Sequence, residues 1–192
     1  MLQYLVLLGA VVQLVGIAAY LKETLQGKTK PNKVTWLMWS IAPLIAGVAA
    51  LADGAGWAAL PTIISGSSAA LVLLASFTNR QAYWRLETFD YLCGLCSILA
   101  LILWYATREP IVAITFAILS DAFATAPTVL KAWTHPKSET PLAYTTGLFN
   151  ALTSFSAIRT PSISSIAFPL YWAATNCCII LILYRSKNGR SK

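Results

Sequence analysis

The sequence contains little charge. Asp, Glu, Lys and Arg make up 11% of its 192 residues, whereas about 25% is usual in soluble domains. It also lacks a glycine-rich loop that could bind a nucleotide phosphate, a pair of carboxylates at catalytic spacing, and a second histidine that could join His135 in a metal site. These absences argue against a soluble enzyme, and we expect no catalytic residue, no cofactor and no metal.

Long apolar runs are abundant instead. Hydrophobic residues make up 57% of the chain, and the mean hydropathy is +0.65. A run of about 20 residues is long enough to cross a hydrocarbon core of ~30 Å. We therefore predict an all-α membrane protein with seven transmembrane helices in one membrane domain, residues 1–192. The runs are 2–21, which we expect to be a retained helix, 35–51, 57–77, 88–107, 111–130, 140–158 and 163–184.

Basic residues are divided unevenly between the predicted loops. With seven crossings, only Arg108 and Arg159 of the 14 lie on one side. The positive-inside rule then puts the N-terminus outside and the C-terminus in the cytoplasm, in a multi-pass protein of the cell inner (plasma) membrane. Loops that face anionic lipid explain the net charge of +7, so we expect no nucleic acid partner. The other basic residues are Lys22, Lys28, Lys30, Lys33, Arg80, Arg85, Lys131, Lys137, Arg185, Lys187, Arg190 and Lys192.

The chain contains an internal repeat. The first three and the last three apolar runs show the same order of features, and the fourth run restores a parallel orientation between the halves. We predict a 3+1+3 architecture, with three-helix repeats over 1–79 and 110–185, a linker helix over 80–109 and a basic cytoplasmic tail over 186–192. Aligned pairs are Pro31 with Pro136, Thr35 with Thr140, Leu37 with Leu142, Trp39 with Tyr144 and Pro61 with Pro169.

The repeat places four polar side chains at one depth. Gln13 aligns with Asp121 and Ser68 with Asn176, each about 11 or 12 residues into a helix that starts outside. Lipid penalises such groups, above all the carboxylate, so we expect them to face one another or a water-filled cavity between the halves. Each residue also has a purely structural alternative. Ser68 could allow close helix contact, Gln13 and Asn176 could form interhelical hydrogen bonds, and Asp121 could serve in capping or packing.

Prolines and aromatic residues form two further patterns. Pro43 and Pro127 interrupt predicted helices, where each permits a kink that is either a hinge or a static bend. Trp39, Tyr144 and Trp172 lie deeper than the interfacial belt, and their rings could stack on a solute or simply pack. We place the remaining aromatic residues at the membrane interfaces, and those on the cytoplasmic rim are Tyr20, Trp36, Tyr83, Trp84, Trp133 and Tyr184.

The chain resembles the SWEET and PQ-loop (MtN3-like) transporter superfamily in four features. They are the 3+1+3 order, Pro127-Thr128 at a cytoplasmic helix end, the Lys/Pro loops 28–33 and 135–137, and Asn176. The chain is similar to an uncharacterised bacterial seven-helix branch of this superfamily. The resemblance implies a sugar facilitator whose pocket uses an asparagine on each third helix. Here Ser68 replaces one of the two asparagines. Ala19-Tyr20 also stands where a proline-glutamine pair would mark the first repeat.

We therefore expect a secondary transporter or facilitator of a small polar organic solute, sugar or nucleoside-like, with a midplane pocket between the repeats. Gln13, Ser68, Asp121 and Asn176 would line it. Asp121 would accept a hydrogen bond from solute hydroxyls or carry a coupled proton. Pnu-type vitamin-precursor transporters and proton-driven lysosomal exporters have a similar architecture.

Two other classes of protein fit the sequence. In the first, a membrane receptor or assembly protein uses the same fold to bind a ligand without transport. In the second, Cys93 and Cys96, which share one helix face, act as a thiol oxidoreductase; the alternative is that they pack as small apolar residues. The sequence leaves open the substrate, the direction of transport, the coupling, and whether the chain forms a homo-oligomer.

Overall fold

The computed structural model describes residues 5–52, 60–106, 110–158, 161 and 163–188. Within them it has seven α-helices and no strand, which confirms the predicted all-α fold and the order of the seven helices. The α-helices are α1 (Leu5–Leu25), α2 (Lys33–Ala52), α3 (Leu60–Thr78), α4 (Thr88–Ala106), α5 (Pro110–Thr134), α6 (Pro141–Ser154) and α7 (Ile163–Asn188). Short 3₁₀ turns are η3 (Arg80–Ala82), η4 (Pro136–Ser138) and η5 (Phe155–Ala157).

Local sequence explains where the helices of the first and second halves begin and end. Gly27 follows α1 with a φ of 72°, a left-handed conformation that glycine adopts without steric cost. The amide of Lys28 then donates to the Glu23 carbonyl at 2.9 Å, which closes a Schellman motif. In the second half, Pro141 occupies the first turn of α6, where its missing N–H costs no hydrogen bond.

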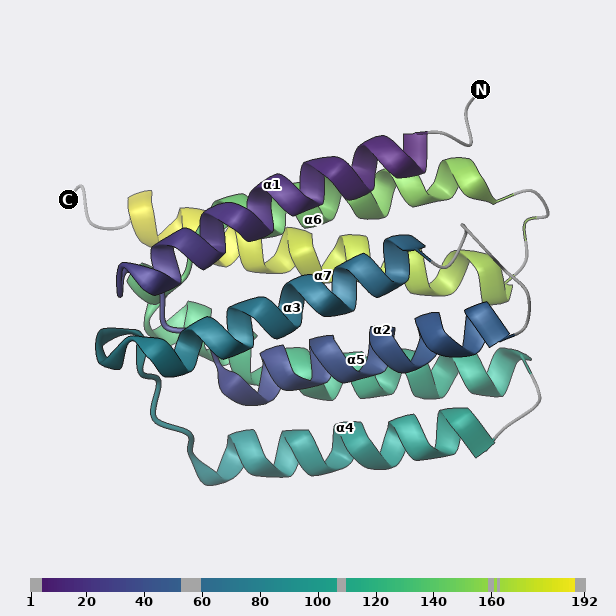
Figure 1. Ribbon diagram of the computed structural model, residues 1–192, viewed down its shortest axis with the longest axis horizontal. Coiled ribbons are helices and arrows are strands. Elements are labelled where there is room, and N and C mark those ends of the chain that lie inside the picture. Colours follow the sequence, from purple (N-terminus) through teal and green to yellow (C-terminus); the bar gives the residue numbers. More distant parts are fainter. Residues whose placement is uncertain (1–4, 53–59, 107–109, 159–160, 162, 189–192) are drawn as a thin grey trace.

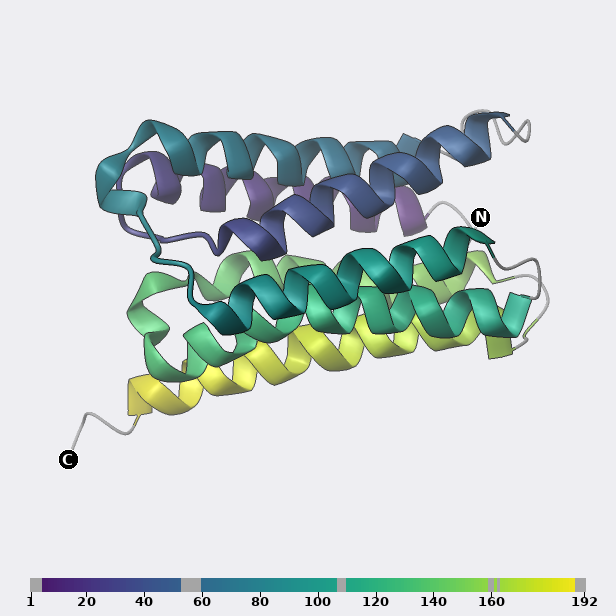
Figure 2. The same ribbon diagram turned by 90° about the horizontal axis from the view of Figure 1, so that it is seen from below.

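The helices pack in a pattern that repeats between the halves. In the first half, α3 contacts both α1 and α2, and in the second half α7 contacts both α5 and α6. Between the halves, α1 packs on α6 and α2 packs on α5. If α1 is exchanged with α5, α2 with α6 and α3 with α7, this set of contacts is unchanged. Figure 2 shows the first three helices as one layer over α5, α6 and α7, with α4 beside α5.

One end of the bundle, at the left in Figure 1, carries the α1–α2 connection, η3, η4 and the end of α7. Every basic residue that the structure describes belongs to this end. Two helices, Leu5–Leu25 and the segment Ile166–Arg185, are long and apolar enough to cross a membrane. Large apolar side chains, among them Leu74 and Leu181, are exposed along the outside of the bundle.

Two of the aromatic residues predicted to lie on the rim are instead in the core. Tyr20 and Trp36 are fully buried and pack together, with ring centroids 4.8 Å apart. The prediction was wrong because α3 and α6 cover both rings, with Ala69, Val72 and Ala143 in the same buried cluster. Trp133, Tyr83 and Tyr184 are exposed.

Candidate functional site

Asp121 is half-buried on α5 and is surrounded by side chains of three helices. Its Oδ2 accepts a hydrogen bond from the Tyr171 hydroxyl of α7 at 2.9 Å. It accepts a second one at 3.3 Å from Thr125 Oγ1, one turn further along α5. The Trp39 side chain of α2 also interacts with this carboxylate. The predicted acid therefore lies where the first half of the chain meets α5 and α7.

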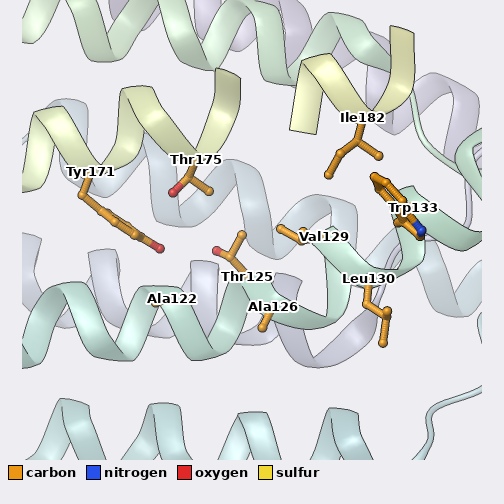
Figure 3. Close-up of a pocket in the computed structure, with 9 residues that line it drawn as sticks. All are labelled: Ala122, Thr125, Ala126, Val129, Leu130, Trp133, Tyr171, Thr175 and Ile182. Atoms are coloured by element: carbon orange, nitrogen blue, oxygen red, sulfur yellow. The ribbon is translucent and has the colours of Figure 1, made fainter. Parts of the chain in front are cut away.

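A pocket of about 450 Å³ lies between α5 and α7 beside this acid. Figure 3 shows the hydroxyl groups of Tyr171, Thr125 and Thr175 converging at one end of it. The remainder of the pocket is apolar and extends toward the basic end of the bundle. Its lining residues are Ala122, Thr125, Ala126, Val129, Leu130, Trp133, Tyr171, Thr175 and Ile182.

The first half has a much smaller pocket between α1 and α3, the helices that correspond to α5 and α7. Gln13, Ser65 and Ser68 belong to its lining, and its volume is about 10 Å³. The difference follows from side-chain size, because the repeat aligns Leu14 and Ile17 of the small pocket with Ala122 and Thr125 of the large one. The larger pocket therefore lies in the half of the chain that carries the Asp121 carboxylate.

The four predicted midplane residues do not form one hydrogen-bonded cluster among the residues described. Gln13 Oε1 accepts from the Asn150 amide of α6. Ser68 Oγ donates to the Ile64 carbonyl at 2.6 Å, and Asn176 Nδ2 donates to the Trp172 carbonyl at 2.8 Å. Gln13 and Ser68 share the small pocket, whereas Asp121 adjoins the large one. Each of the two pockets lies between helices of the same half, whereas we expected one pocket between the two halves.

The other predicted residues take different roles. Tyr144 is buried, and its hydroxyl donates to Glu139 Oε2 at 2.8 Å, so it belongs to another cluster. Trp172 is half-buried and lines neither of the two pockets described above. Pro43 lies inside α2. Pro127 is buried inside α5, between Asp121 and the basic end of that helix.

Sequence reasoning missed the two hydroxyl partners of Asp121. A threonine four residues after an acid in one helix lies on the same face, so the position of Thr125 carried a usable signal. Tyr171 had no comparable signal, because its contact depends on how α7 packs against α5. Among the described residues, no group of three His, Cys, Asp or Glu side chains could hold a metal ion.

A second polar cluster is buried at the basic end of the bundle. Lys131 and Glu139 form an ion pair, and their side chains are 1% and 0% exposed. Glu139 Oε2 accepts from the hydroxyls of Tyr20 at 2.9 Å and Tyr144 at 2.8 Å, and Lys131 Nζ also donates to the Lys30 carbonyl. Lys131 lies at the predicted end of the molecule. The expectation that it faces anionic lipid was wrong, because Glu139 pairs with it inside the bundle.

No family model matches the chain, and no curated protein and no solved structure matches it.

Proposed function

We propose that the protein is a secondary transporter or facilitator of a small polar organic solute, with Asp121 as the central residue of its binding site. The observation that carries this proposal is the half-buried carboxylate that accepts two hydroxyl hydrogen bonds beside a pocket of about 450 Å³. Small-molecule sites are usually concave, mostly apolar and about 300–1,000 Å³ in volume, with a few convergent polar groups. This pocket has that composition, and its polar end suits the hydroxyls of a sugar or nucleoside.

The proposal includes a membrane location with seven spans, the N-terminus outside and the C-terminus in the cytoplasm. Two features support it: apolar side chains are exposed along the bundle, and the described basic residues gather at one end. The contact pattern that is unchanged by exchange of the halves supports a 3+1+3 repeat and the resemblance to the SWEET and PQ-loop superfamily. Repeat-built transporters bind their solutes near the middle of the membrane, where Asp121 would lie.

The experiment begins with purified protein in detergent, screened for a rise in Tm against hexoses, ribonucleosides and amino acids. The solute that stabilises the protein is then loaded into proteoliposomes, and counterflow of its labelled form is measured. Counterflow that requires the protein supports transport. Stabilisation without counterflow contradicts transport and favours a receptor that only binds.

The residue-level prediction concerns Tyr171. Tyr171→Phe removes the hydroxyl that holds the Asp121 carboxylate in place at the polar end of the pocket. Without it the carboxylate is no longer oriented toward the solute, and the hydrogen bond between solute and carboxylate would contribute about 1.5–3 kcal/mol. We expect the solute to bind at least ~10-fold more weakly, as measured by the concentration that gives half of the Tm shift. The matched control is Tyr184→Phe, because Tyr184 is an exposed tyrosine of the same helix. If the two variants bind the solute with equal affinity, Tyr171 does not belong to the solute-binding site.

A further inference from the structure

The pocket between α5 and α7, called the groove from here on, has the depth of one membrane leaflet from its hydroxyl end to its mouth. Its lining on α5 begins at Ala122 and ends at Trp133, and its lining on α7 begins at Tyr171 and ends at Ile182. Each span corresponds to about 16 Å of helix at 1.5 Å per residue, close to half of a ~30 Å hydrocarbon core. The groove therefore reaches from the middle of the membrane to the basic end of the bundle.

The mouth of the groove is exposed and carries a positive charge. Leu130 and Trp133 are 50% and 57% exposed. The Arg185 guanidinium lies 5.2 Å from the centre of the Trp133 ring. Arg185 follows the lining residue Ile182 by three positions, so it lies on the same face of α7. A planar guanidinium binds phosphate through two hydrogen bonds at once.

We propose that this groove binds one acyl chain of an anionic phospholipid from the cytoplasmic leaflet, with the lipid phosphate at Arg185. The inference rests on the membrane location given under the proposed function. Charge complementarity supports this occupant, since the cytoplasmic leaflet is the anionic one and the groove opens at the basic end. A helix of ~10 Å diameter would occupy more than about 1,000 Å³ over this length, so the groove is too small for a partner helix.

The acyl chain and the solute would occupy different parts of the same pocket. The chain would contact Ala126, Val129 and Ile182, and the solute would contact the hydroxyl end at Tyr171 and Thr175. A bound chain then closes the side of the solute site that faces the membrane. Lipid would bind whether or not the protein transports a solute.

The test measures Tm of the purified protein in detergent during titration with phosphatidylglycerol or with phosphatidylcholine that has the same acyl chains. A ligand that binds only the folded protein raises its stability with concentration. We expect phosphatidylglycerol to raise Tm of the wild type by several degrees and phosphatidylcholine to raise it less. Arg185→Gln should abolish the difference between the two lipids. Ala126→Leu, which fills the groove, should abolish both shifts while leaving Tm without lipid nearly unchanged.

Three controls identify the source of the effect. Arg80→Gln removes an exposed arginine at the same end of the bundle but away from the groove, and it should keep the wild-type response. Asp121→Asn should also keep the lipid response, so failure of the solute site leaves this result unaffected. Any of three results would overturn the proposal. The first is an equal rise in Tm with inorganic phosphate alone, and the second is an unchanged lipid response of Arg185→Gln or Ala126→Leu. The third is a loss of response with Arg80→Gln as large as that with Arg185→Gln.

Discussion

Lys131 and Glu139 are two opposite charges that lie inside the bundle, where water does not compete for them. Taking each ion out of water costs several kcal/mol, and the pair is tolerated because each group has further hydrogen-bond partners. Tyr20 and Tyr144 supply those partners for Glu139, and the Lys30 carbonyl supplies one for Lys131. The cluster links the start of α6 to α1 and α5.

The first residue-scale prediction concerns this ion pair. Glu139→Gln leaves the Lys131 charge buried without its counter-ion, and we expect a loss of about 3–5 kcal/mol in the free energy of unfolding. The Lys131→Met/Glu139→Gln double variant removes both charges and should recover much of that loss. Unfolding in a denaturing detergent titration measures both values. A double variant less stable than Glu139→Gln would contradict this account.

Asp121 could be predicted from the sequence, whereas Glu139 could not. Asp121 is conspicuous because every near neighbour in its run is uncharged. Glu139 stands among the polar residues of a connection, beside Lys137 and close to His135, and such residues are usually solvated. Its burial depends on Tyr20, which is 119 positions away in the chain, and no local pattern encodes that distance.

At the scale of helices, the contact between α1 and α6 depends on glycine. A Cβ added at Gly16 would overlap the Thr146 hydroxyl, and a Cβ added at Gly9 would meet the side chains of Asn150 and Thr153. Small residues of this kind allow two helix backbones to approach closely, which is a common way for helices to associate in membranes. The approach joins the two halves of the chain.

The element-scale prediction is that Gly16→Ala destabilises the protein by about 1–3 kcal/mol through overpacking. Thr146 is held by hydrogen bonds to the carbonyls of Leu142 and Ala143, so it has little freedom to move away. In the Gly16→Ala/Thr146→Ala variant the overlapping atoms are gone, and stability should largely return. Ala18→Leu, on the exposed face of α1, is the control that should leave stability nearly unchanged. A Gly16→Ala variant as stable as that control would exclude close packing here.

The helices could be predicted well because each is built on a long apolar run, and their order and approximate bounds follow from length alone. The position of the large pocket could not be predicted. It depends on small residues, Ala122 and Thr125, standing where the first half has Leu14 and Ile17. A sequence pattern marks such residues only as apolar or small, and the space that they leave appears once the facing helix is in place.

At the scale of the whole molecule, the distribution of basic residues distinguishes the two ends of the bundle. The described basic residues lie at one end, together with the end of α7. We expect this end to face the cytoplasm, because positively charged loops are retained there. A fluorescent protein fused to the C-terminus should therefore fold and fluoresce, while alkaline phosphatase fused at the same place should be inactive. The opposite pair of results would invert the proposed topology.

The central claim is that Asp121 is the residue on which solute movement depends, and proton-driven uptake tests it most directly. Wild type, Asp121→Asn and the control Glu23→Gln, whose acid lies at the basic end of α1, are compared in proteoliposomes with and without an inward proton gradient. The solute is the one found by the stability screen. We predict that Asp121→Asn takes up the solute far more slowly than the wild type and Glu23→Gln, and that any acceleration by the gradient in these two is absent from Asp121→Asn. Uptake by Asp121→Asn at the wild-type rate, with the same acceleration by the gradient, would contradict the claim.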